Sequence, residues 1–182
     1  MKVSLGHALK QGPCIAMLGK VAVASLRHKG AADLKTPGPI REAQLPPREA
    51  TLLLDYIEWT GGELPAYHGQ VPAHFFPQWG FPLLAEALGD VPWPMSRILN
   101  QGCRIENRAP LPAGEDLHCT AQLVSVEESE TKARITTRIV TGSHGVPEAI
   151  VADVHAVVPL RKKKGSGGKR PPPVVPEDAI EL

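Results

Sequence analysis

The second half of the chain alternates between apolar and polar residues with a period of two, which is typical of strands with one buried face. Four segments carry this alternation and are predicted as strands: 97–106, 115–126, 131–141 and 148–160. In the third strand the apolar set lies opposite the charged set: Ala133, Ile135, Thr137 and Ile139 against Lys132, Arg134 and Arg138. Short polar turns join the last three strands, which predicts an antiparallel meander with one packed face and one solvated face.

The first half of the chain contains a short segment with helical spacing. Residues 48–60 place Leu52, Tyr56 and Trp59 on one face, and the pair Gly61-Gly62 follows as a helix stop. The Pro- and Gly-rich run before this segment breaks any helix, so we expect a strand or a loop there.

A second helix is predicted at about residues 80–89. Pro82 suits its first turn, Gly89 suits its end, and the residues between them are apolar around most of the helix surface. Such a helix has to be buried. A sheet that curls around it is the economical arrangement for one apolar helix followed by a long antiparallel sheet.

Composition and charge divide the chain into three parts. Residues 1–39 form a basic N-terminal extension with a predicted helix at 14–29, residues 40–160 form the predicted domain, and residues 161–182 form a basic, Pro-rich tail of flexible composition. Residues 49–160 carry fourteen Asp and Glu against six Lys and Arg. A body this acidic argues against general nucleic-acid binding, which needs positive surface.

The three cysteines, Cys14, Cys103 and Cys119, have no metal-ligand spacing, and their odd number argues against a disulfide framework. The longest apolar stretch, Cys14–Leu26, is too short to span a membrane and lacks the features of a secretory signal. We therefore expect a cytoplasmic protein with no metal site and no membrane span. The sequence also lacks a Gly-rich phosphate loop and a GxSxG motif, which removes nucleotide-cofactor enzymes and serine hydrolases from consideration.

Residues 71–90 and 97–123 together resemble the MaoC-like acyl dehydratase and (R)-specific enoyl-CoA hydratase branch of hotdog-fold proteins. In that family a Pro-rich aromatic loop leads into the central helix. A strand follows, and then a turn of the type Arg-x-Pro-(Leu, Ile or Val)-x-x-Gly-(Glu or Asp)-x-Leu. Here the turn reads Arg108-Ala-Pro110-Leu111-Pro-Ala-Gly114-Glu115-Asp-Leu117. The resemblance covers about residues 40–160 and implies an α+β hotdog fold, with an antiparallel sheet wrapped around the helix at 80–89.

This resemblance also implies a function. Its members bind acyl thioesters of CoA or of an acyl carrier, need no further cofactor, and add or remove water at carbons 2 and 3 in fatty acid metabolism. They act as dimers or as two hotdogs in one chain. We therefore expect a homodimer, or a heterodimer with another hotdog chain, and a site between the loop before the central helix and the partner.

The sequence departs from the family where the chemistry is done. Active members carry Asp-x-Asn-Pro-x-His before the central helix, and the Asp and His activate the water or proton that adds across the double bond. This chain has Tyr67-His68-Gly69-Gln70-Val71-Pro72-Ala73-His74 there, and no Asp from Tyr56 to Gly89. The usual dyad cannot be assigned.

Three interpretations stay open. His68 or His74, with Glu63, provides a different acid–base pair, or the chain is an acyl-binding, non-catalytic subunit like the corresponding half of double-hotdog hydratases. The Pro-rich aromatic loop matches the second interpretation better. The alternative is an acyl-CoA thioesterase on the same fold, in which a histidine or a carboxylate, Glu63 or Glu86, directs water.

The candidate site residues lie in the loop, at the start of the central helix and in the first long strand. His74 and His68 are the candidate catalytic groups. The candidate substrate-binding residues are Tyr67, Phe75, Phe76, Gln78, Trp79, Gly80, Phe81 and Asn100. All eight aromatic residues of the chain lie between Tyr56 and Trp93, which places the predicted acyl pocket in the same window.

Overall fold

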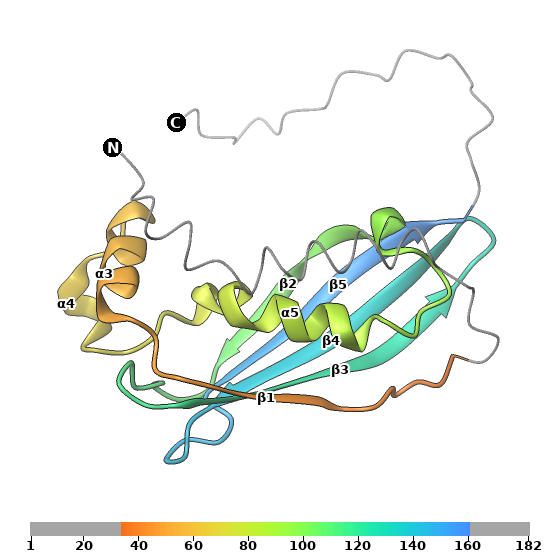
Figure 1. Ribbon diagram of the computed structural model, residues 1–182. Coiled ribbons are helices and arrows are strands. Elements are labelled where there is room, and N and C mark those ends of the chain that lie inside the picture. Colours follow the sequence, from red (N-terminus) through yellow and green to blue (C-terminus); the bar gives the residue numbers. More distant parts are fainter. Residues whose placement is uncertain (1–33, 161–182) are drawn as a thin grey trace, which may run out of the picture.

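The computed structural model describes residues 34–160 (Figure 1). The predicted helix at 14–29, most of the extension 1–39 and the whole tail 161–182 lie outside the described residues. In chain order the elements are β1 (Arg41–Leu45), α3 (Ala50–Trp59), α4 (Leu64–Tyr67), the 3-10 turn η1 (Ala73–Phe75), α5 (Pro77–Ala87), the 3-10 turn η2 (Met95–Arg97), β2 (Leu99–Asn107), β3 (Leu117–Glu128), β4 (Lys132–Gly142) and β5 (Ile150–Pro159).

The strands form one antiparallel sheet in the order β1-β3-β4-β5-β2. Helix α5 lies across one face of this sheet, and α3 and α4 lie at one end of it (Figure 1). The predicted meander of the last three strands is confirmed, and the first long strand, β2, returns to pair with β5 at the edge. The segment before the first helix is a strand, β1, which forms the other edge.

The face of the sheet that meets α5 is the apolar face predicted from the alternation. In β3 the inward residues Leu117, Cys119, Ala121 and Leu123 are all buried, and in β4 Ala133, Ile135, Thr137 and Ile139 are buried. Most of them belong to two adjoining clusters of core residues that also include α5 side chains or residues just after the helix. The predicted α+β arrangement, a sheet packed around one central helix, is therefore confirmed.

The central helix begins at Pro77 rather than at residue 80. Pro77 fits the first turn because its missing N–H would have no partner there. The N–H groups of Trp79 and Gly80 both donate to the Phe76 carbonyl, at 3.2 and 2.8 Å. These two hydrogen bonds belong to the first turn of the helix, which therefore begins before Gly80.

The earlier start puts Pro82 inside the helix instead of in its first turn. Pro82 has no N–H to bond the Gln78 carbonyl, so one helical hydrogen bond is missing there. The helix ends at Ala87 with Leu88 as its C-cap, and Gly89 is exposed just beyond it.

Helix α3 confirms the first predicted helix but buries a different face. Leu52, Leu53 and Ile57 are buried, whereas Trp59 is 36% exposed. Trp59 is the last helical residue, and Gly61 with φ 76° then turns the chain away. The predicted stripe through Trp59 is therefore wrong, because its last position lies where the helix leaves the core.

Buried hydrogen bonds fix α5 on the sheet. Trp79 donates from Nε1 to the hydroxyl of Thr141 in β4 at 2.9 Å, and Thr141 donates to Cys119 Sγ in β3 at 3.7 Å. Burial raises the pKa of the Cys119 thiol to about 11, so this cysteine is a core residue and not a nucleophile. Within residues 34–160, no helix has both the length and the apolar character needed to cross a membrane.

Candidate functional site

His74 lies on η1, directly before the central helix, among aromatic rings from three segments. Its imidazole is 5.3 Å from the Tyr56 ring of α3 and 6.5 Å from the Tyr67 ring of α4, measured between centroids. Tyr56 Oη donates to the His74 backbone carbonyl at 3.3 Å. The His74 side chain is exposed, so one imidazole is presented to solvent between two phenols.

The surroundings of Tyr56 affect its titration. Burial and, to a smaller extent, the neighbouring Tyr67 raise the pKa of Tyr56 above its usual value, so its hydroxyl keeps its proton at neutral pH. Tyr56 also packs on Phe75, with ring centroids 4.3 Å apart, and Phe75 in turn meets Trp79 edge to face. Helix α3 thus fixes the loop that carries His74. The sequence indicates Tyr56 as a residue of a helix face, and only the packing of α3 on the loop brings it to the site.

The predicted second histidine lies apart from this group. His68 is exposed and adopts φ 46°, a left-handed conformation, at the end of α4. Within the described residues, the hydrogen bonds, ion pairs and ring contacts of His74 involve neither His68 nor Glu63 nor Glu86. The structure therefore brings His74 together with tyrosines and not with a carboxylate.

The aromatic candidates of the loop and of the start of the central helix pack into the core. Phe75, Phe76 and Trp79 are buried, and Phe81 packs edge to face on Phe76 at 6.0 Å. These side chains belong to the core between the helix and the sheet, and we call them the apolar floor of the candidate site. Phe75 connects this floor to the rim, which consists of Tyr56 and Tyr67 beside His74.

At Gly80 the central helix approaches the sheet closely. A Cβ atom at Gly80 would lie 3.1 Å from Ile139 Cδ1, which is tighter than ordinary van der Waals contact. The Gly80 N–H already donates to the Phe76 carbonyl within the helix. The role of Gly80 in this structure is to admit β4 to the helix, and its N–H is not free to bind an oxyanion.

Gln78 points toward the opposite side of the helix from β2. Arg48, between β1 and α3, donates from Nη1 to Gln78 Oε1 at 3.0 Å and from Nη2 to the Pro46 carbonyl at 2.5 Å. Burial lowers the pKa of Arg48, although the group stays charged at neutral pH. Gln78 and Arg48, together with Glu86, line a small cavity of about 210 Å³.

Strand β2 borders the candidate site on the other side, where it lies close to η1. Its residues Cys103 and Ile105 pair with the inward residues Val154 and Ala152 of β5, so they share the helix-side face. Cys103 is an exposed free thiol on that face, which the sequence analysis did not select. Asn100 uses its Oδ1 to accept the Gly102 N–H at 2.9 Å, so it caps its own strand.

The described residues contain no group of three or more His, Cys, Asp or Glu side chains that could hold a metal ion. Residues 34–160 therefore show one exposed imidazole, two phenols and an apolar floor as the chemistry of this site. Such a site can exchange a proton through His74 and can hold an apolar group against the aromatic rings.

Several solved structures share the fold of this chain. The HadBC (3R)-hydroxyacyl-ACP dehydratase complex of Mycobacterium tuberculosis aligns with TM-score 0.57 and 14% identity, over 68% of this chain and 98% of that chain. The chain has a hotdog fold. Its predicted resemblance to the MaoC-like branch is thereby confirmed at the level of the fold.

Two further solved structures share this fold. The (R)-hydratase of A. caviae involved in PHA biosynthesis has TM-score 0.50 and 17% identity, over 69% of this chain and 98% of that chain. HtdX of Mycobacterium tuberculosis has TM-score 0.53 and 14% identity, over 65% of this chain and 51% of that chain. No protein-family model and no curated protein matches the sequence of this hotdog chain.

Proposed function

We propose that this hotdog chain binds acyl thioesters, of CoA or of an acyl carrier, at the His74 site. The observation that carries the proposal is the position of His74. It is an exposed imidazole directly before the central helix, it lies beside Tyr56, which packs on the buried Phe75, and its turn η1 lies close to the edge strand β2. The apolar floor suits an acyl chain, and the imidazole suits a thioester carbonyl or a bound water.

The chemistry that follows binding depends on His74. In a hydratase or dehydratase, His74 would move the proton, and Tyr56, whose phenol stays protonated, would hold the loop that carries it. No carboxylate contacts His74 within the described residues, which favours the role of an acyl-binding subunit that supports another hotdog chain. We place this function in the cytoplasm, in fatty acid metabolism, and we infer that a second hotdog chain closes the site along β2.

The test is a binding measurement combined with two assays. Full-length protein is titrated with a saturated acyl-CoA by calorimetry, and crotonyl-CoA is then followed for loss of the enoyl absorbance and for release of free thiol. Saturable binding with no turnover supports the acyl-binding subunit, and loss of the enoyl absorbance without thiol release supports the hydratase. Thiol release supports the thioesterase alternative. Absence of binding refutes the proposal.

Variants assign the site. His74→Ala is expected to weaken acyl-CoA binding about tenfold or, if turnover is found, to lower kcat about a hundredfold or more. His144→Ala is the matched control, because His144 is an exposed histidine in the turn between β4 and β5. His68→Ala tests the second predicted histidine. Equal effects of His74→Ala and His144→Ala would show that the site assignment is wrong.

A further inference from the structure

A cavity of about 410 Å³ lies at the end of the sheet from which the connection between β4 and β5 projects (Figure 1). Its lining comes from β1, from the start of β3 and from this connection, and includes Gln44, Asp116, Leu117, His118, Ser143 and Pro147. None of these residues belongs to the His74 site. The volume lies within the range of about 300–1,000 Å³ that is usual for small-molecule pockets, so the cavity is large enough for a ligand.

The connection between β4 and β5 folds back onto its own strand. Gly142 lies opposite His118 in the register of β4 with β3, and a Cβ atom at Gly142 would overlap the carbonyl group of Pro147. Ser143 and Val146 then close the turn with two backbone hydrogen bonds, from the Ser143 N–H at 2.9 Å and from the Val146 N–H at 3.2 Å. Gly142 thus lets Pro147 form one wall of the cavity, and the turn holds Ser143 in a fixed place.

The hydroxyl of Ser143 is buried without a partner. The residue is 3% exposed, and its Oγ makes no hydrogen bond within residues 34–160. Its own N–H and carbonyl are both taken by Val146. Buried polar side chains in folded proteins are nearly always hydrogen-bonded. Because Ser143 lines the cavity, a molecule in the cavity can supply the missing donor and acceptor.

The charges around the cavity disfavour an anionic ligand. Asp116 lines the cavity, a Glu42 carboxylate oxygen lies 3.9 Å from His118 Nε2, and no Lys or Arg is among the described residues of the lining. A phosphate or carboxylate would therefore meet carboxylates without a compensating cation. A metal ion is disfavoured as well, because residues 34–160 contain no group of three or more suitable side chains.

The hydrogen-bonding groups of the cavity distinguish an organic cation from a neutral ligand. The Gln44 amide, the Ser143 hydroxyl and the His118 imidazole in its neutral form each offer both a donor and an acceptor. An ammonium group donates but does not accept, so it would leave these donors unpaired, whereas a ligand hydroxyl does both. A neutral molecule with several hydroxyl groups is therefore the best complement.

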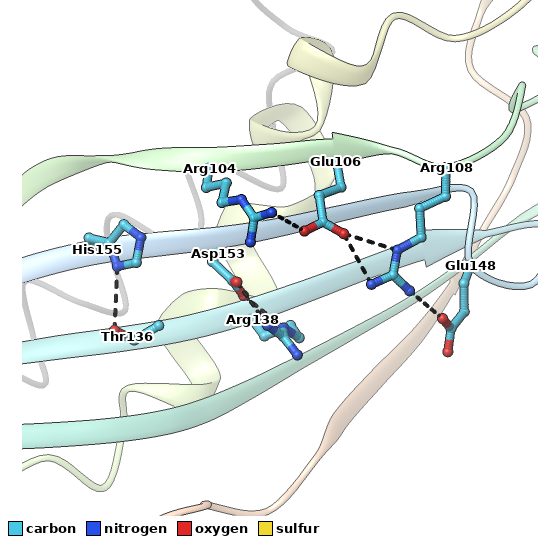
Figure 2. Close-up of polar contacts among 8 residues, drawn as sticks. All are labelled: Arg104, Glu106, Arg108, Thr136, Arg138, Glu148, Asp153 and His155. Carbon is cyan, nitrogen blue, oxygen red and sulfur yellow. Dashed lines mark hydrogen bonds and ion pairs between the residues drawn. The ribbon is translucent and has the colours of Figure 1, made fainter.

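A second hollow, of about 380 Å³, continues this site over the outer face of the sheet and shares His118 and Pro147 with the cavity. The hydroxyl and apolar side chains that it adds are those of Thr120, Ile40 and Val140. Its charged side chains are already paired, Arg138 with Asp153 and Glu148 with Arg108 (Figure 2). We propose that the two hollows together bind a neutral carbohydrate of two rings, whose hydroxyl groups meet the polar side chains and whose C–H faces pack on the apolar ones.

Nuclear magnetic resonance tests this site, with maltose, lactose and sucrose as probes added to the full-length protein. At least one disaccharide is expected to show saturation transfer, to bind in the millimolar range and to shift the amide signals of His118, Thr120 and Ser143. Inorganic phosphate and spermidine are expected to leave these signals unchanged. Absence of binding by all three disaccharides, or shifts confined to other parts of the chain, would overturn the proposal. Tighter binding of phosphate or spermidine at these residues would also overturn it.

Two variants assign the site to its side chains. Ser143→Ala removes the buried hydroxyl, and it is expected to weaken disaccharide binding about tenfold through the loss of one hydrogen bond. Asp116→Ala is expected to weaken it at least about tenfold, because hydrogen bonds to a charged group are stronger. Ser129→Ala is the matched control, since Ser129 is exposed in the turn between β3 and β4. Binding that is equally tight in Ser143→Ala and Ser129→Ala would contradict the proposal.

Thermal unfolding separates a ligand site from a hydroxyl that the fold itself uses. Loss of a buried hydroxyl that has no partner is near neutral or stabilising, so Ser143→Ala without sugar is expected to melt at or above the wild-type temperature. The disaccharide should raise the melting temperature of the wild-type protein more than that of the variant. A variant that melts below the wild type without sugar would show that an ordered water alone satisfies Ser143, which would overturn the proposal.

The carbohydrate site does not depend on the proposed function, because it shares no residue with the His74 site. Acyl-CoA binding to the wild-type protein is measured with and without the disaccharide, and the two dissociation constants are expected to be the same. Disaccharide binding without acyl-CoA binding contradicts the proposed function alone. Competition between the two ligands would show that the hollows belong to the acyl site, and would overturn the proposal of a separate one.

Discussion

The two faces of the sheet are held by different forces, although the same strands supply both. On the inner face, β4 presents Ile139 and Thr141 to the central helix, and both are buried. On the outer face, its neighbours Arg138 and Val140 lie in or near solvent, and Arg138 is joined to Asp153 of β5 by two hydrogen bonds (Figure 2). Alternate residues of one strand are therefore buried among apolar side chains on the inner face and lie among solvent-exposed charges on the outer face.

The inner face therefore contributes most of the stability of the fold. Burial of an aliphatic side chain in a close-packed core contributes several kcal/mol, whereas exposed ion pairs contribute roughly 0–1 kcal/mol. The inner face should therefore tolerate substitution poorly. The outer face should tolerate it well, and is available for contacts with other molecules.

Adjacent substitutions in β4 should give the largest contrast. Ile139→Ala is expected to lower the free energy of unfolding by about 2–5 kcal/mol, because it leaves a cavity beneath Gly80 and Phe76. Val140→Ala, on the next residue and the other face, is expected to cost less than about 1 kcal/mol. Urea denaturation of both variants measures the difference. Equal losses would contradict the assignment of the two faces.

The buried hydrogen bond between helix and sheet should give a smaller effect. Thr141→Val leaves the Trp79 indole N–H buried without its acceptor, which is expected to cost about 1–3 kcal/mol. Thr136→Val is the control, because Thr136 lies on the outer face of the same strand and meets only His155, at 3.4 Å. Thermal unfolding followed by tryptophan fluorescence compares them. A loss at Thr136 as large as that at Thr141 would argue that the helix-to-sheet bond adds nothing.

The smallest effect is expected from the outer-face pair, and it depends on pH. The hydrogen bonds from Arg138 lower the pKa of Asp153, so the pair stabilises the fold fully above the usual carboxyl pKa of about 3.9. That contribution is lost as the pH falls through the lower, folded-state pKa. Asp153→Asn is expected to cost at most about 1 kcal/mol at pH 7, because Arg138 is half exposed.

Acid titration of stability checks the sign of this effect. The difference between wild-type protein and Asp153→Asn should shrink as the pH falls below about 4, because the carboxyl of the unfolded chain takes up its proton there and that of the folded protein follows at lower pH. Glu127→Gln is a suitable control, since Glu127 is an exposed carboxylate near the end of β3. A difference that grows on acidification would contradict the stabilising role of the pair.

The strands were predictable because their signal is local. In β4 the side chains alternate without interruption, so the pattern alone separates Ile139 from Arg138. The central helix was predictable as an element but not in its start. Its close approach to the sheet at Gly80 was not predictable either, because Gly80 and Ile139 are far apart in the chain.

The candidate site was predictable in its place but not in its partners. His74 and its aromatic neighbours were enough to predict that the site lies in the loop before the central helix. The contacts of His74 with Tyr56 and Tyr67 arise because α3 and α4 pack at one end of the sheet (Figure 1). Asn100 was expected to face a ligand, whereas the bulge at Gly102 turns its side chain onto the chain itself.

Periodicity and turn chemistry in the chain suffice to specify the meander, the apolar central helix and the segment that carries the histidine, because each depends on neighbours within a few residues. The strand order, the face that α3 buries, the tyrosines around His74 and the bulged edge of β2 depend on long-range packing. Such contacts are set by which surfaces meet when the sheet closes on the helix, and a local pattern does not contain that information.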